Sequence, residues 1–335
     1  MTDFAEVGPN TPRSEGTAGP IEANAWRASG VAALYSIAVV NGFAVDIVEA
    51  VRAQPFWAAL MSTFGISVVS VAAVACGIML VLRSAGRAAS RGDVAIALLV
   101  AGLLLVPHRA GSWAALTVLA LFELTRSRAT DGDRVAAAIF LALAASEFWA
   151  RIALQSLGNV MLSWDAALVA GLLSHFVTGE IVRSGNLIVL PDGTSLALIV
   201  GCDSLTNVAY GVLCWLVIAK GLRPNWISFD VFAVFAVAVG VVSLNTVRVA
   251  LMAGDPQSYE LVHGAVGADA FNLILLALSG AIALWTVRNT PQPLGDHTSA
   301  AGGFQHRRQG RLLRAAGRCC CGVDGRGPAG DISRE

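Results

Sequence analysis

Three side chains that are suited to acyl-transfer chemistry follow one another in the second half of the chain: Cys202, Arg248 and His263. A thiolate attacks carbonyl carbon, a histidine moves protons near neutral pH, and an arginine stays charged and can stabilise an oxyanion. Cys202 stands just before an apolar, helix-like segment that runs to Ala219. Because free N–H groups at the start of a helix favour an anion, this position favours a thiolate.

Each of the three residues also has an ordinary explanation. Cys202 fits a buried structural cysteine, Arg248 a cation that reaches from a helix end toward water, and His263 a polar loop residue. The argument for catalysis is their shared position, because the predicted topology places all three at one membrane face, on successive helix ends.

Composition places the chain in a membrane. Hydrophobic residues make up 56% of it and charged residues 14%, and its mean hydropathy is +0.66, outside the range of soluble proteins. We predict an all-α polytopic membrane protein of about eight transmembrane helices, each an apolar run near the length that crosses a bilayer. The predicted spans are 30–50, 57–82, 94–107, 111–124, 135–150, 203–219, 227–247 and 266–287.

The basic residues orient these spans. Several inter-span loops carry them, namely Arg83, Arg87, Arg91, Arg126, Arg128, Arg134, Lys220 and Arg223. The positive-inside rule puts these loops and both termini in the cytoplasm, and Cys202 at the extracytoplasmic face of the cell membrane. This topology requires that 151–202 make no net crossing, so we expect 161–179 to be an amphipathic helix lying on the outer surface.

That expected surface helix has a recognisable apolar face, although the segment is apolar enough to compete as a span. The face is formed by Leu168, Val169, Leu172, Leu173 and Phe176. Asp165 falls on the same face, which disfavours burial of the helix in hydrocarbon.

The segment before Cys202 predicts a short β-hairpin. Two β-like runs, 181–190 and 194–200, flank Pro191-Asp192-Gly193. Proline fixes its own φ, aspartate can bond the following backbone, and glycine tolerates positive φ, so this tripeptide is a turn signal. After the cysteine, we expect Ser204 to cap the next helix rather than to act as a second nucleophile.

The chain divides into three parts. We expect 1–28 to be a disordered cytoplasmic tail, 29–288 the membrane domain, and 289–335 a disordered, Arg- and Gly-rich cytoplasmic tail that includes Cys319, Cys320 and Cys321. The six cysteines do not have the spacing of a metal site or a disulfide framework, so we expect no metal and no cofactor.

The order of these motifs resembles the exosortase/archaeosortase family of membrane-embedded sorting enzymes. The resemblance covers about 30–290 and is clearest from 175 to 270. It rests on the stretch 183–188 and the Pro-Asp-Gly turn that lead into Cys202, on the N-x-x-R element that ends at Arg248, and on His263 followed by Gly264.

The resemblance implies a cysteine protease or transpeptidase with Cys202, Arg248 and His263 as its catalytic set. Its partners would be secreted proteins that end in a PEP-CTERM-like tail, a short motif followed by a transmembrane helix and a basic end, together with membrane lipids and no nucleic acid. Processing would be coupled to anchoring, or to export with envelope polysaccharide. The family usually shows Ala-Cys-Ser-Gly where this chain has Gly201-Cys202-Asp203-Ser204, which puts the accepted peptide in question. We expect Asn245, Asp203 and Ser204 to bind substrate.

A non-catalytic scaffold or transporter subunit of an envelope polysaccharide export system is the alternative. A transporter would normally carry charges or broken helices near the membrane midplane. The acidic residues Asp46, Glu49 and Glu147 are interpreted as solvated charges at outer helix ends, where Glu147 could pair with Arg151. The unusual residues therefore gather at one face, which favours the enzyme.

Overall fold

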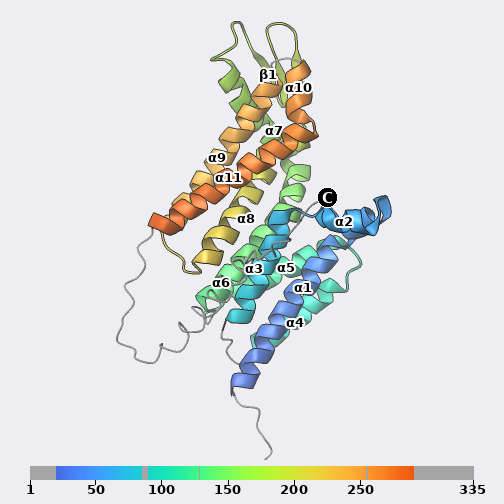
Figure 1. The fold of residues 1–335 in the computed structure, drawn as a ribbon, viewed down its shortest axis with the longest axis vertical. Helices are drawn as coiled ribbons and strands as arrows, with labels where there is room; N and C mark the ends of the chain where they lie inside the picture. The colour runs from blue at the N-terminus through green and yellow to red at the C-terminus, as the bar shows by residue number, and fades with distance from the viewer. Residues whose placement is uncertain (1–19, 85–89, 128, 254–255, 290–335) are drawn as a thin grey trace, which may run out of the picture. The chain divides into compact units, whose positions relative to one another are not determined.

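The computed structural model describes residues 20–84, 90–127, 129–253 and 256–289, and both expected tails lie mostly outside this range. Helices make up most of the described chain (Figure 1). Five described helices are long and apolar enough to cross a membrane, which confirms the prediction of a helical membrane protein. They cover Ala28–Ala53, Asp131–Leu173, Ser204–Leu222, Phe229–Met252 and Val266–Asn289.

The other three predicted spans coincide with shorter helices. The predicted span 57–82 is broken into α2 (Phe56–Met61), a 3-10 turn and α3 (Val68–Arg83), because Thr63 and Phe64 adopt left-handed φ angles of 51° and 54°. Such angles end a right-handed helix. The predicted spans 94–107 and 111–124 correspond to α4 (Arg91–Leu104) and α5 (Arg109–Thr125), which pack against each other as a helical hairpin.

One continuous helix replaces a predicted span and the predicted surface helix. It consists of α6 (Asp131–Ala144), the π-helical turn η2 (Ala145–Trp149) and α7 (Ala150–Leu173), 43 residues in all. At 1.5 Å per residue it is about 64 Å long, roughly twice the thickness of the hydrocarbon core. The prediction of a separate helix over 161–179 is therefore wrong.

The buried face of α7 also differs from the predicted one. Leu168 is 48% exposed and Phe176, beyond the helix, is 78% exposed. The residues that α7 buries near its end are Leu162, Asp165, Ala166, Val169 and Leu173. The apolar residues among them pack against the strands that follow, so the partner of this face is protein rather than lipid headgroups.

The strands form a small antiparallel sheet in the order β1 (Val182–Ser184), β2 (Leu187–Val189) and β3 (Ser195–Ala197). The Pro191-Asp192-Gly193 turn forms as predicted: Gly193 has a φ of 88°, and Asp192 Oδ1 accepts a 2.9 Å bond from the Thr194 N–H. The first predicted run is itself folded in two at Gly185, whose φ is 61°. A three-stranded meander thus stands where we predicted one hairpin.

Two apolar cores hold the described chain together. The larger one joins α1 (Pro20–Ala53), α3, α5, α6, α8 (Ser204–Leu222), α9 (Phe229–Met252) and α11 (Ala265–Asn289), and includes Tyr35 stacked on Phe140 with ring centroids 4.0 Å apart. The smaller core lies where the end of α7, the sheet and α9 meet, and Cys202 belongs to it. A Cβ on Gly211 would lie 2.9 Å from Val241 Cγ2, so glycine is needed for the close approach of α8 to α9. In the smaller core, the sheet and α9 fix the surroundings of the cysteine.

Candidate functional site

Cys202 ends a 3-10 turn, η3 (Val200–Cys202), that connects β3 to α8. Its N–H donates a 2.8 Å bond to the Ile199 carbonyl, and the side chain packs with Ala166 of α7 and Val249 of α9. The residue is 8% exposed. Lys220 and Arg223 lie at the far end of α8, so the cysteine and the basic loop are separated by the full helix.

Burial dominates the electrostatics of the thiol. It raises the pKa of Cys202 above its ordinary value, because a thiolate would lose solvation. The backbone of Ile199 and the charge of Arg248 act in the opposite direction, while the carboxylates of Asp203 and Asp165 raise the pKa further. In this conformation the thiol is protonated at neutral pH and needs a base to become a nucleophile.

Two carboxylates already occupy the N-terminus of α8. Asp203 is the N-cap, and its Oδ1 accepts a 2.7 Å bond from the Thr206 N–H. Asp165 Oδ2 accepts a 2.9 Å bond from the Ser204 N–H. The prediction that Ser204 caps this helix is therefore wrong, because the acidic side chain one residue earlier takes the free N–H group. The predicted preference of this helix end for a thiolate is met by Asp203 and Asp165 instead.

The third predicted substrate contact, Asn245, connects α9 to the cysteine turn. Its Nδ2 donates to the Cys202 carbonyl at 2.8 Å and to Ser204 Oγ at 3.0 Å. Asn207 joins the network, donating from Nδ2 to the Asp203 carbonyl at 2.8 Å. Asn245, Asp203 and Ser204 are all buried, so in this conformation they position the turn that carries the thiol.

Arg248 lies one helical turn beyond Asn245 on α9, and its charge acts on the Cys202 thiol. The guanidinium lies 4.6 Å from the centroid of Phe271 of α11. Its Nε is buried and makes no hydrogen bond within the described residues. Arg248 also lines a pocket of about 450 Å³ that is otherwise largely apolar, between α9, α10 (Pro256–His263) and α11. A cation with an unpaired donor at the side of an apolar groove can hold an anionic or carbonyl oxygen.

His263 is the last residue of α10, and its side chain is exposed. Its ring stacks on Tyr259, with centroids 5.0 Å apart. Within the described residues, no hydrogen bond or ion pair joins His263 to Cys202. Asn245 thus connects α9, which carries Arg248, to the cysteine turn, whereas His263 is exposed on α10 and is not bonded to either residue within the described part of the chain.

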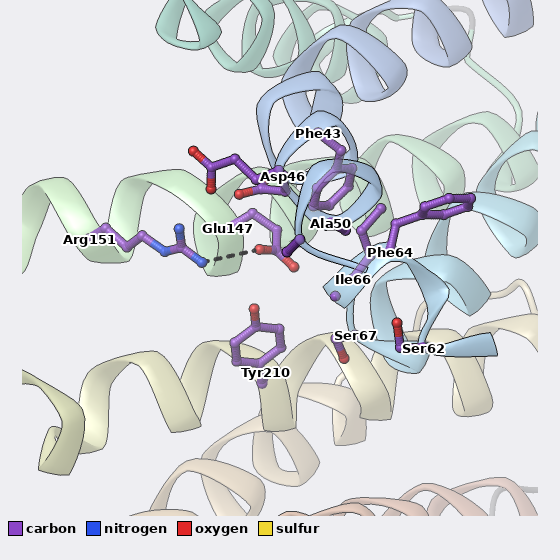
Figure 2. Close-up of a pocket in the computed structure, with 13 residues that line it drawn as sticks. Phe43, Asp46, Ala50, Ser62, Phe64, Ile66, Ser67, Glu147, Arg151 and Tyr210 are labelled. Atoms are coloured by element: carbon purple, nitrogen blue, oxygen red, sulfur yellow. Dashed lines mark ion pairs between the residues drawn. The ribbon is translucent and has the colours of Figure 1, made fainter. Parts of the chain in front are cut away.

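A second polar site, which the sequence did not reveal, surrounds Glu147 in the π-helical turn (Figure 2). Glu147 is 8% exposed: Ser70 Oγ donates to its Oε1 at 2.6 Å, and Arg151 Nη2 lies 3.7 Å from its Oε2. The hydroxyl of Tyr210 on α8 points toward it across the pocket. The interpretation of Glu147 as a solvated charge is therefore wrong, although the pairing with Arg151 is confirmed.

This pocket has a volume of about 560 Å³ and receives two further carboxylates, Asp46 and Glu49, from α1. A single turn of π-helix often marks a functional site in a helical protein, because it reorients side chains within an otherwise regular helix. One sequence signal pointed here: Glu147 interrupts an apolar run with an arginine at i+4. No described group of three or more His, Cys, Asp or Glu side chains is arranged to hold a metal ion.

No protein-family model, no curated protein and no solved structure matches the chain.

Proposed function

We propose that this protein is a membrane-embedded cysteine protease or transpeptidase of the exosortase/archaeosortase type. Its site would lie at the extracytoplasmic face of the cell membrane and would process the C-terminal sorting tails of secreted proteins. The observation that carries the proposal is the 2.8 Å bond from Asn245 of α9 to the Cys202 carbonyl, because Arg248 lies one helical turn beyond Asn245. Cys202 lies in the turn before α8 and Arg248 lies on α9, so both would belong to the side of the membrane remote from Lys220 and Arg223.

The chemistry divides among the three residues. His263 takes the proton of Cys202, and the sulfur attacks the peptide carbonyl to form a tetrahedral oxyanion that Arg248 stabilises. Collapse of this intermediate breaks the C–N bond, and His263 returns the proton to the leaving amine. Water or an amine then attacks the thioester and regenerates the thiol. No cofactor takes part in these steps.

The first step requires a change in the structure described above. Because the thiol is buried and protonated, His263 must approach it, and α10 is the element that carries the histidine. Substrate binding in the apolar groove beside Arg248, which α10 helps to form, supplies a reason for that movement. In the same topology the shorter helices α3, α4 and α5 also cross the bilayer, which makes eight spans and keeps the basic loops in the cytoplasm.

Replacement of each catalytic residue in cells tests the proposal. Cys202→Ala, Arg248→Ala and His263→Ala should each be expressed normally and should accumulate uncleaved precursors that end in an apolar span and a basic cluster. Cys214→Ala is the matched control, because Cys214 is a buried cysteine of α8, the helix that follows Cys202. Normal processing by Cys202→Ala would exclude the enzyme.

One observation favours the alternative, a transporter subunit. Glu147 is an ionisable group buried in a long apolar helix, and such groups often mark transport pathways. If the protein is a transporter subunit for envelope polysaccharide, Glu147→Gln should abolish export while Cys202→Ala leaves it intact. The reverse pattern is expected for the enzyme.

A further inference from the structure

The hydrogen bonds of the sheet leave one edge of β3 free. The N–H of Leu198 bonds to the Asn186 carbonyl at 2.9 Å, and the N–H of Leu190 bonds to the Thr194 carbonyl at 2.8 Å. Bonded and non-bonded pairs alternate along an antiparallel ladder, so Ile188 and Leu196, which lie opposite each other between these two pairs, form the next bonded pair. The backbone groups of the residues on either side of Leu196 must therefore point away from β2.

Those residues are Ser195 and Ala197. Both are exposed, and none of their outward N–H and C=O groups has a hydrogen-bond partner within the described residues. At about 3.4 Å per residue, the two sets of groups lie roughly 7 Å apart, which is the spacing of alternate residues in an extended peptide. The edge of β3 is thus complementary to the main chain of another strand.

The opposite edge of the sheet is held against α7. Arg183 of β1 donates from Nη1 to the carbonyl and the hydroxyl of Ser163, at 3.1 and 3.0 Å. Proteins usually protect a free edge by keeping the strand very short, or by a charge, a proline, a bulge or a cover. β3 is short, but the side chains of Ser195, Leu196 and Ala197 supply no charge and no proline, and Leu196 packs on the core below.

The free edge continues directly toward the cysteine. Ile199 and Val200 follow two and three residues after β3, and they are 54% and 57% exposed. Two exposed apolar side chains at this point can receive one apolar side chain of a peptide that lies along β3. A strand added here would extend toward the turn that carries Cys202.

We propose that the edge of β3 binds an extended peptide segment by strand addition and guides it to Cys202. Backbone pairing of this kind supplies affinity with little dependence on sequence, and the side chains in adjoining pockets supply selectivity. The ligand is thus the extended stretch of the sorting tail that precedes its transmembrane helix. This inference rests on the proposed function, and it adds the mode of substrate binding.

A proline at position 197 tests the edge directly. Ala197→Pro removes the outward N–H but leaves the β2–β3 ladder intact, and proline is tolerated on the free side of an edge strand. The substrate to follow is the precursor that accumulates in Cys202→Ala cells. We expect the Ala197→Pro protein to process this precursor about tenfold more slowly than the wild type, or slower still. Ala197→Ser, which keeps the N–H, should have a much smaller effect. The alkylation rate of Cys202 should match that of the wild type, which shows that the site remains folded.

A second measurement uses a photo-crosslinking amino acid in the Cys202→Ala background. Placed at Ser195 it should capture the accumulated precursor, and placed at the exposed turn residue Asp192 it should capture much less. Suppose that Cys202→Ala blocks processing, that Ala197→Pro does not, and that the crosslinking amino acid at position 195 captures no precursor. Strand addition is then excluded, while the proposed enzymatic function still stands. If Ala197→Pro also alters alkylation, the crosslink at Ser195 decides. Normal processing by Cys202→Ala would remove both proposals together.

Discussion

The side-chain amide of Asn245 donates to the main-chain carbonyl of Cys202 over 2.8 Å, so α9 holds the turn that carries the thiol. Asn245→Leu keeps the approximate size of the side chain and leaves the buried carbonyl of Cys202 and the hydroxyl of Ser204 without this donor. Each group left unsatisfied costs about 1–3 kcal/mol. We expect a lower unfolding temperature of the purified protein in detergent. The neighbouring variant Thr246→Val, which loses a bond only within its own helix, is the control. Equal unfolding temperatures for both variants would contradict the assigned role.

The reactivity of Cys202 should depend on pH in a defined way. In a variant whose sole cysteine is Cys202, the alkylation rate by a small neutral reagent should rise with a midpoint above the ordinary thiol pKa, because burial disfavours the thiolate. Arg248→Leu should move the midpoint higher, since the cation stabilises the thiolate. Asp203→Asn should move it lower, since the carboxylate opposes it. A lower midpoint for Arg248→Leu, or a higher midpoint for Asp203→Asn, would show that other charges control the thiol.

The pocket around Glu147 gives a test that does not depend on Cys202. Glu147→Ala removes the acceptor of the Ser70 bond and the partner of Arg151, and should destabilise the protein by about 1–3 kcal/mol. Glu147→Gln keeps an oxygen acceptor for Ser70, so we expect a smaller loss in thermal unfolding. If Glu147→Gln unfolds normally but lacks processing activity, this pocket has a role in function as well as in packing.

Reporter fusions test the orientation. Fusions after Arg91 and Arg223 should report the cytoplasm, and fusions near Gly193 and Gln257 the outside, because basic loops remain on the cytoplasmic side. A cytoplasmic signal near Gly193 would place the sheet and Cys202 on the wrong side for secreted substrates.

Local signals in the sequence predicted the long apolar helices and the turn between two of the strands. Hydropathy located four of the five long helices and the first part of the fifth, and the Pro191-Asp192-Gly193 turn formed because each of its residues has a strong backbone preference.

Partners distant in sequence decided the remainder. Asp165 seemed incompatible with an apolar helix face, yet it is satisfied by an N–H of α8, 39 residues later. Glu147 is stabilised by Ser70, 77 residues earlier. Neither bond has a local signature, and the same is true of the π-helical turn that makes α6 and α7 one helix. For this reason the surface helix and the solvated glutamate were wrong predictions.

The 43-residue helix formed by α6, η2 and α7 has a mechanical consequence. It begins near Arg134, beside the basic loops, and reaches the sheet beside Cys202. The rise of the helix therefore sets the distance along its axis between the basic loops and the sheet. A thicker or thinner bilayer would change how much of this helix is covered by lipid without changing that separation. If the chain processes sorting tails as proposed, this helix would act as a molecular ruler that fixes the height at which a tail anchored by its own basic end meets the thiol.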